Sequence, residues 1–253
     1  MIEANGIVPV RRVRKASEQV ADQLRELILS GQIAPEQRLP NETVLAAQFG
    51  VSRSTIREAL RELSALSLIR TMKGVNGGSF VTVPTVEHIS AFLSANIGLL
   101  SQAEHVSLDE VLEARVLLEV PAVRLAARRR TETDLDNLRA AIPERPLDVD
   151  QEHRFNLNKD FHSVLVAASG NTLLSICAQP IFTVLQTSLK RSTLGNRFHY
   201  RVAEDHRALM SSIESGDEAA AAEQMHDHLN YLTSTYRKAW RHPVAAEHGA
   251  AAE

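Results

Sequence analysis

The chain has little cysteine, few aromatic residues and no long apolar run, and each shortage narrows the class of protein. Its 253 residues include one cysteine, Cys177, so no disulfide can form within a chain, as is usual in the cytoplasm. No apolar run approaches the roughly 20 residues of a membrane-spanning helix, and the N-terminus lacks the apolar segment of a signal peptide. We therefore expect a cytoplasmic protein without a membrane partner, in which Cys177 is a small core residue.

The net charge is −3, but its sign differs along the chain. Residues 1–85 carry 11 Lys and Arg against 8 Asp and Glu, so the acidic excess belongs to the remainder. A basic excess confined to one part of a chain is typical of a domain that binds nucleic acid. Because this excess is modest, we expect that two copies are needed for firm binding.

Residues 50–63 have the pattern of the turn and second helix of a helix-turn-helix. Gly50 permits a tight turn, and Ser52 is a good helix N-cap. Ile56, Leu60 and Leu63 recur at helical spacing and predict a buried stripe. The side chains left facing outward at the start of the helix are Arg53, Ser54, Thr55 and Arg57. Such side chains contact phosphates and base edges when a helix enters the major groove by its N-terminus.

The flanking sequence predicts the rest of a DNA-binding domain. A helix over 17–30 ends at Gly31, and a short helix begins at Pro40 or Asn41. Two β-prone runs, 68–72 and 79–83, flank a glycine-rich turn and predict a hairpin. A basic, glycine-rich hairpin after a helix-turn-helix is a wing, whose tip can lie close to DNA.

These landmarks resemble the DNA-binding domain of the GntR family of bacterial transcription regulators. The resemblance runs from Val20 to Val83, and its matching segments are 31–35, 38–42, 45–46, 49–60 and 77–81. It implies a winged helix-turn-helix joined to an effector-binding domain, acting as a homodimer on an inverted-repeat operator in double-stranded DNA.

The same resemblance implies which residues contact the operator. Those of the main body are Arg38, Ser52, Arg53, Ser54, Thr55 and Arg57, and those of the wing are Lys73, Gly74 and Gly77. For the basic residues among them, the alternative is a side chain that is merely solvated.

Helical patterns dominate beyond Pro84. We expect helices over 86–100, 108–130, 132–141, 148–168, 172–189, 196–215 and 217–239. Pro121 lies inside one of them and should kink it or remove a hydrogen bond. The predicted fold is mainly α, with three helices and a β-hairpin wing followed by an all-α bundle of six to seven helices. We assign 10–84 to the DNA-binding domain, 85–240 to an effector-binding and dimerisation domain, and 241–253 to a disordered tail.

The second half resembles the FCD-type effector domain of the FadR branch of the same family. The segments that carry this resemblance are 113–115 with Glu119, 158–162 with 169–171, 205–209, and 228–229. The resemblance implies a pocket that recognises a small carboxylic acid or related metabolite. Such pockets often contain a divalent metal ion held by one carboxylate and three histidines.

The residues themselves give partial support for a metal. Asn158 and His162 are four residues apart and share a helix face, while His206 and His228 lie among apolar neighbours on later helices. Three imidazoles and one oxygen would suit Zn²⁺ or Ni²⁺. The alternative for each histidine is a hydrogen-bonded core residue. Proteins of this type usually have Asp where this chain has Asn158, so we expect the metal to be held less tightly.

Arg115 is the candidate effector-binding residue. A guanidinium in a helical pocket can clamp a carboxylate through two parallel hydrogen bonds. The alternative is a structural ion pair with Glu119, four residues further on. Among the other histidines, His226 is expected at the surface, and His153 and His199 have no partner pattern and are expected to be solvated.

Together these features predict a metabolite-responsive transcription regulator, which we expect to be a repressor and not an enzyme. One alternative is a metal-dependent enzyme that uses the histidine cluster, but the chain has no motif that places a general base beside it. The other is a DNA-architectural protein without an effector, which would need neither an inward-facing Arg115 nor three inward-facing histidines.

Overall fold

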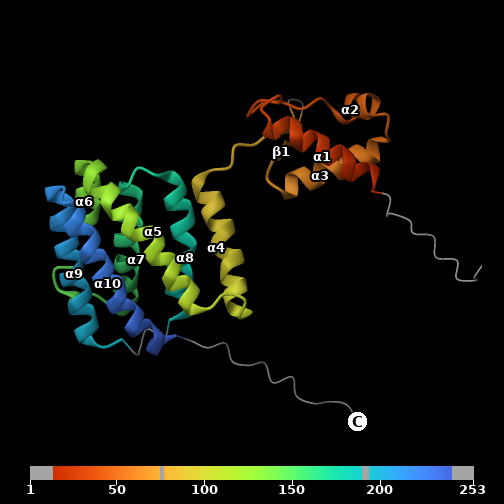
Figure 1. The fold of residues 1–253 in the computed structure, drawn as a ribbon. Coiled ribbons are helices and arrows are strands. Elements are labelled where there is room, and N and C mark those ends of the chain that lie inside the picture. Colours follow the sequence, from red (N-terminus) through yellow and green to blue (C-terminus); the bar gives the residue numbers. More distant parts are fainter. Residues whose placement is uncertain (1–13, 75–76, 190–193, 241–253) are drawn as a thin grey trace, which may run out of the picture. The chain divides into compact units, whose positions relative to one another are not determined.

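The computed structural model describes residues 14–74, 77–189 and 194–240, and they form a mainly α protein (Figure 1). The chain divides into two compact units at Thr85 and Val86. The predicted fold class is confirmed, since three helices and a hairpin precede an all-α bundle. The predicted tail, 241–253, and residues 10–13 lie outside the described residues. Within the described ranges, no helix combines the length and apolar composition needed to cross a membrane.

The N-terminal unit is a winged helix-turn-helix. Its elements are α1 (Ala16–Leu29), α2 (Glu42–Phe49), α3 (Arg53–Ala65), β1 (Ile69–Met72) and β2 (Gly78–Val81). The strands pair antiparallel, with Ile69 opposite Val81. Gly50 ends α2 with a φ of 66°, a conformation that disfavours side chains. The Ser52 hydroxyl then accepts the Thr55 N–H at 3.1 Å and caps α3.

A small core fixes which face of α3 is exposed. Ile56 and Leu63 are fully buried, against Leu24 of α1 and Leu45 of α2. Because the apolar stripe faces inward, the opposite side of the helix and its first turn face solvent. The predicted burial of this stripe therefore determines the orientation of the polar residues at the start of α3.

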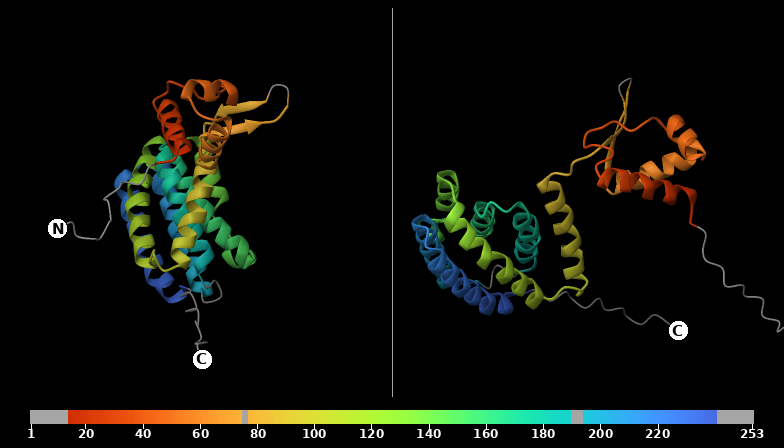
Figure 2. Two further views of the ribbon diagram at one scale, coloured as in Figure 1. Left: turned by 90° about the vertical axis from the view of Figure 1, so that its right-hand side faces the viewer. Right: turned by 45° about the horizontal axis from the view of Figure 1, so that its top comes forward.

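The C-terminal unit is a helical bundle, seen from two further directions in Figure 2. Its elements are α4 (Val86–Gln102), α5 (Leu108–Arg129), α6 (Glu132–Ala140), η1 (Pro146–Asp148), α7 (Gln151–Ala168), α8 (Thr172–Ser188), α9 (Asn196–Ser215) and α10 (Glu218–Ala239). Helix α5 packs against α7 and α10, and α4 packs against α8. Pro121 lies inside α5, which continues as one helix to Arg129. The buried core of the bundle is built from residues of α5 to α10.

The placement of Cys177 contradicts the expectation from sequence. Cys177 is exposed on α8, as is Leu173, whose exposed fraction is 71%. The buried side of α8 begins one residue later, with Ala178 and Phe182. This run is mostly apolar, with Ser175 as its one polar residue between Leu173 and Ala178, so the sequence does not show clearly which side of this helix faces the core.

Candidate functional site

Three buried histidines converge inside the bundle. His162 lies on α7, His206 on α9 and His228 on α10, and their exposed fractions are 0%, 1% and 1%. One ring nitrogen of each lies within 4.8 Å of one from each of the others. Helices from three separate parts of the chain thus bring together the three histidines singled out from sequence, and this cluster could bind a metal ion.

Two carboxylates orient two of these rings. Glu119 Oε2 lies 2.5 Å from His162 Nδ1, and Asp205 Oδ2 lies 3.0 Å from His228 Nδ1. When each Nδ1–H donates to its carboxylate, each Nε2 carries a lone pair directed away from it. The two Nε2 atoms are 3.4 Å apart. Two nitrogens bound to one tetrahedral zinc at about 2.0–2.1 Å would be separated by about 3.3–3.4 Å, so their spacing fits a shared cation.

Burial keeps these rings neutral. It lowers the pKa of His162 and of His206 well below the usual value for histidine. Burial also lowers the pKa of His228, although the neighbouring Asp205 opposes this shift. A neutral imidazole offers a lone pair, which a metal ligand requires. The cluster is therefore in the right protonation state for metal binding at neutral pH.

Two buried polar atoms at the cluster lack hydrogen-bond partners among the described residues. They are His206 Nε2 and Asn158 Oδ1. The His206 ring stacks on Phe161, with centroids 3.8 Å apart, so its orientation is fixed. Leaving a buried polar atom unpaired costs about 1–3 kcal/mol, and a bound ion would remove that cost. The donor set of three imidazoles and one amide oxygen fits a divalent metal, though it contains no charged ligand.

Arg115 and Glu119 form a buried ion pair on α5. Their exposed fractions are 3% and 0%, and Arg115 Nε lies 2.5 Å from Glu119 Oε1. Burial raises the pKa of Glu119, and the charge of Arg115 opposes that rise. Glu119 contacts two partners: Oε1 accepts a hydrogen bond from Arg115, and Oε2 lies beside His162 Nδ1. The ion pair considered as an alternative from sequence is present, and Arg115 also lines a hollow beside Asn158 and His162.

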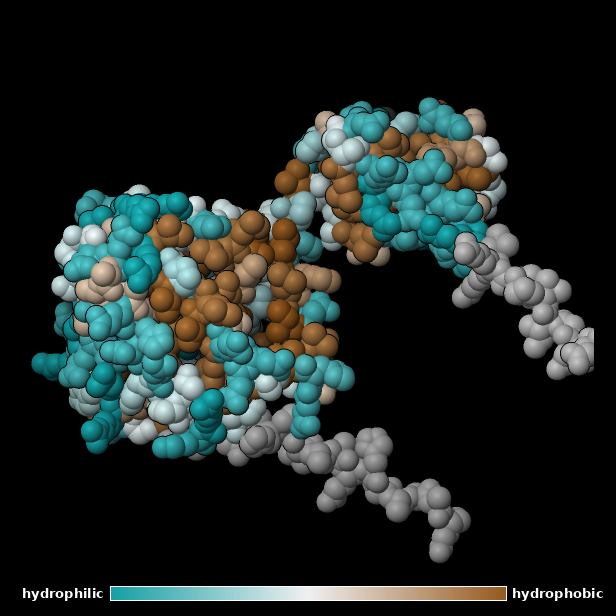
Figure 3. Space-filling view, in the orientation of Figure 1, coloured by the Kyte–Doolittle hydropathy of each residue, from teal (hydrophilic) through white to brown (hydrophobic). Residues whose placement is uncertain are grey.

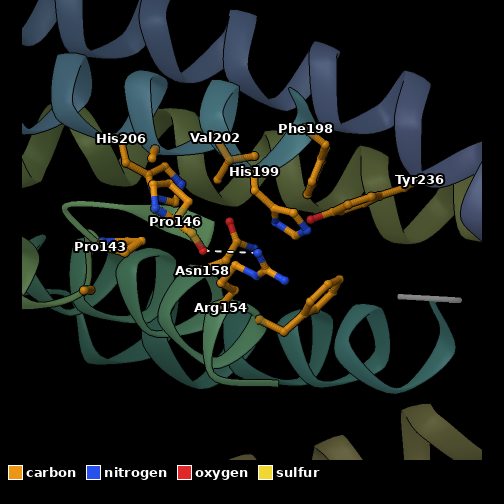
Figure 4. Close-up of a pocket in the computed structure, with 12 residues that line it drawn as sticks. Pro143, Pro146, Arg154, Asn158, Phe198, His199, Val202, His206 and Tyr236 are labelled. Atoms are coloured by element: carbon orange, nitrogen blue, oxygen red, sulfur yellow. Dashed lines mark hydrogen bonds between the residues drawn. The ribbon is translucent and has the colours of Figure 1, made fainter. Parts of the chain in front are cut away.

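A pocket opens on the other side of Asn158, and Figure 4 shows the side chains that line it. Its empty space, including the open mouth, is about 420 Å³. Arg154 and Asn158 enter it from α7, His199 and His206 from α9, and Tyr236 from α10. The unpartnered atoms of Asn158 and His206 thus belong to residues that line this pocket.

His199 corrects another expectation. It is 92% buried in this pocket, with an exposed fraction of 8%, rather than solvated. A spacing of seven residues places it two helical turns before His206, on the same face of α9. That spacing was a usable sequence signal. His153 and His226 are exposed, as expected.

Other contributors could be found only from the structure. Glu119 and Asp205 contact histidines that lie 43 and 23 residues away in sequence. Asp205 precedes His206 but orients His228 on the next helix, so sequence adjacency points to the wrong histidine. Arg154 stands one helical turn before Asn158, a spacing visible in the sequence, but no motif marks it.

The start of α3 presents most of the candidate DNA contacts to solvent. Arg53, Ser54 and Arg57 are exposed, and Thr55 is half-buried. Ser52 Oγ lies 2.7 Å from the Ser54 hydroxyl and 2.8 Å from the Thr55 hydroxyl, so the cap also orders its neighbours.

No sequence pattern indicated the contact between Arg57 and Glu42, the first residue of α2. The guanidinium binds both carboxylate oxygens, at 3.1 and 2.7 Å. Glu42 therefore holds Arg57 in place across the turn of the helix-turn-helix.

The remaining candidates lie at the wing. Arg38 donates a hydrogen bond to the Gly77 carbonyl. A Cβ at Gly77 would stand 2.4 Å from the Met72 carbonyl oxygen, so this position accepts only glycine without movement. Lys73 and Gly74 are exposed. Arg38 and Gly77 thus help to shape the wing, whereas Lys73 is free to reach outward.

Comparisons with known proteins agree with this two-part architecture. Residues 16–81 match the family described as "Bacterial regulatory proteins, gntR family", and residues 110–231 match the FCD domain. The "Putative L-lactate dehydrogenase operon regulatory protein" of Escherichia coli (strain K12) is 30% identical over 233 residues, which cover 89% of this chain and 88% of that protein.

A further relative is the "HTH-type transcriptional repressor NanR" of Citrobacter rodentium (strain ICC168). It is 28% identical over 235 residues, covering 88% of this chain and 86% of that protein. Among solved structures, "Streptococcus agalactiae GntR" superposes with a TM-score of 0.50 and 26% identity, over 86% of this chain and 99% of that one.

Proposed function

Because this chain belongs to the GntR family of bacterial transcription regulators and carries an FCD domain, we propose that it is a cytoplasmic repressor controlled by a small carboxylic acid. The observation that carries the proposal is the cluster of His162, His206 and His228, buried in the same chain as a winged helix-turn-helix. Its unpartnered atoms belong to residues that line a pocket. The relatives of this chain are transcription regulators rather than enzymes.

The DNA-binding domain, 10–84, binds one half of an inverted-repeat operator. The base and phosphate contacts come from the start of α3, the wing and Arg38, and they are Arg38, Ser52, Arg53, Ser54, Thr55, Arg57, Lys73, Gly74 and Gly77. The exposure of Arg53 and Arg57 supports this assignment, as does the burial of the opposite face of α3.

A homodimer is needed to bind both half-sites. Apolar residues gather on one face of the C-terminal unit (Figure 3). Large apolar side chains that are strongly exposed on α4, α5 and α8 are Phe92, Leu99, Leu117 and Leu173. Contiguous apolar surface of this kind marks a protein interface. We assign this face of the 85–240 domain to contact between two copies of the chain.

Asn158, His162, His206 and His228 would hold the metal ion, with Zn²⁺ or Ni²⁺ suited to the imidazole donors. A bound divalent ion would supply positive charge that attracts an effector carboxylate. Glu119 and Asp205 keep the His162 and His228 rings oriented. Arg115, which lines the adjoining hollow, provides a guanidinium for the effector if the acid displaces Glu119 from it.

The effector acts through the equilibrium between two arrangements of the dimer. An acid that binds more tightly to the arrangement unable to hold DNA shifts the population toward it. Helices α7, α9 and α10 contribute side chains to the pocket and to the histidine cluster. A ligand there acts on several helices of the bundle at once.

Metal content provides the first test. Protein purified without a chelator or histidine tag is expected to contain close to one Zn or Ni per chain by elemental analysis. His206→Ala should abolish this content, because it removes one of three imidazoles from the cluster. His226→Ala, which removes an exposed histidine on α10, is the matched control and should retain the metal. Metal-free wild type would contradict the metal site.

Effector response tests the function itself. We would select DNA from a random pool with the wild-type protein, and expect an inverted repeat. L-lactate, suggested by the operon named for the Escherichia coli relative, and L-malate should then be added separately, with the uncharged lactamide as control. One or both acids should weaken operator binding at least about 5-fold, measured by fluorescence anisotropy. If neither acid changes the affinity, control by a carboxylate is contradicted; DNA binding without sequence preference would favour the architectural alternative.

A further inference from the structure

Arg154 is a cationic side chain that lines the pocket, and the proposed function gives it no role. It lies on α7, half-buried, and lines the pocket together with His199 and Tyr236. Its Nε is buried and has no hydrogen-bond partner, while one terminal nitrogen donates to the Pro146 carbonyl at 3.2 Å (Figure 4). Across residues 14–74, 77–189 and 194–240, no carboxylate oxygen lies within 4.0 Å of this guanidinium.

Two other arginines near the site, Arg115 and Arg201, are matched by carboxylates. Glu119 lies 2.5 Å from Arg115, and Asp205 lies 2.7 Å from Arg201. Arg154 is not matched. Burial lowers the pKa of His199, and the charge of Arg154 adds to this shift. The pocket therefore contains one positive charge that the described residues do not balance. A half-buried cation without a counter-ion is unfavourable, and an anion would correct this.

Asn158 does not supply the negative charge that would balance Arg154. Its amide oxygen is neutral, so the donor set beside Arg154 includes no carboxylate. Arg154 and Asn158 are four residues apart, which places them on one face of α7 about 6 Å apart along the helix axis. A short acid with charged groups at both ends could occupy both positions.

We propose that Arg154 binds a second anionic group of the effector, which is therefore a compact dianionic acid whose other carboxylate lies beside Asn158 and His206. This inference rests on the proposed function and specifies the class of effector. His199 lies across the pocket from Arg154 (Figure 4) and is available as a second hydrogen-bonding group. Arg115 is not required to leave Glu119 in this arrangement.

The competing interpretation is structural. The hydrogen bond from Arg154 to Pro146 joins α7 to the short helix η1, and this contact could be its whole role. Arg207 offers a matched comparison, because it also donates to loop carbonyls, those of Pro143 and Glu144 at 2.9 and 3.0 Å, but it does not line the pocket.

L-malate and L-lactate distinguish the two interpretations, since both are 2-hydroxy acids and malate has one additional carboxylate. Isothermal titration of the full-length, Zn²⁺-supplemented protein should show malate binding at least about 10-fold more tightly than lactate, the effect expected of a charge-assisted hydrogen bond. Arg154→Gln should weaken malate binding by about 10-fold or more and change lactate binding less than about 3-fold. Arg207→Gln should leave both affinities unchanged.

Arg154→Lys keeps the charge and should retain part of the malate preference, so it decides the matter if Arg154→Gln does not fold. Equal affinities for the two acids in the wild type would overturn the inference, as would equal losses for both acids in Arg154→Gln. In those cases the proposed function stands if either acid still releases DNA. Failure of both acids to bind the wild type would overturn the carboxylate effector as well.

Discussion

Replacing Arg53 and Arg57 together by alanine is expected to weaken operator binding by about 100-fold or more. Each contact to a base edge is worth about 1–3 kcal/mol, and about 1.4 kcal/mol corresponds to a tenfold change in affinity. Both arginines are exposed at the start of α3, so their loss should affect DNA binding rather than folding. Fluorescence anisotropy with the selected operator, repeated at several salt concentrations, measures the effect.

The contact between Arg57 and Glu42 is compatible with the proposed role of Arg57 in binding DNA. Arg57 is 49% exposed in this pair, and exposed ion pairs contribute only about 0–1 kcal/mol. A phosphate or guanine edge can therefore replace Glu42 at low cost. Arg139→Ala is the matched control, since Arg139 also forms an exposed ion pair, with Glu214 of the C-terminal unit. Unchanged operator affinity in the double variant would contradict the assignment of α3 as the recognition helix.

Glu119→Ala is expected to lower the free energy of unfolding by about 3–5 kcal/mol, the usual cost of leaving one partner of a buried ion pair uncompensated. The substitution removes the carboxylate that pairs with the Arg115 guanidinium, whose exposed fraction is 3%. It also removes the hydrogen-bond partner of His162 Nδ1. Urea denaturation of the metal-free protein, followed by circular dichroism, provides the measurement. Using metal-free protein separates this loss from any loss of metal binding.

An exposed ion pair provides the comparison for Glu119→Ala. Arg128 pairs with Glu218 at 2.5 Å, and its side chain is 61% exposed. Arg128→Ala should therefore cost no more than about 1 kcal/mol. If Glu119→Ala were as mild as Arg128→Ala, Arg115 would have to reach solvent in the variant, and the buried pair would not hold α5 in its present packing.

The parts of the fold that local sequence determines were predictable. The Ser52 cap, the Gly50 turn and the Ile56–Leu63 stripe lie within one helix and its approach, and the structure confirms each of them. The helices of the bundle were predictable for the same reason, because caps and periodicity act over a few residues. Convergence of His162, His206 and His228 followed from their apolar surroundings together with the family resemblance.

Contacts between helices were not predictable in this way. The partners of Glu119, Asp205 and Glu42 depend on how helices pack, and no local pattern encodes that packing. Cys177 was misplaced because it lies in a mostly apolar run, while the structure exposes it. His199 was misplaced for a different reason: its spacing from His206 was visible, but its own neighbours suggested no partner.

The position of Glu119 between two partners also bears on how effector specificity can change through mutation. Substitutions at Arg115 and at His162 cannot be independent, because both residues share this one buried carboxylate. A change at Arg115 that suited a new ligand would therefore also disturb the histidine cluster and the stability of α5. Arg154 instead donates to the Pro146 carbonyl. New ligand preferences are thus more accessible to natural or laboratory evolution through substitutions at Arg154 than through substitutions at Arg115.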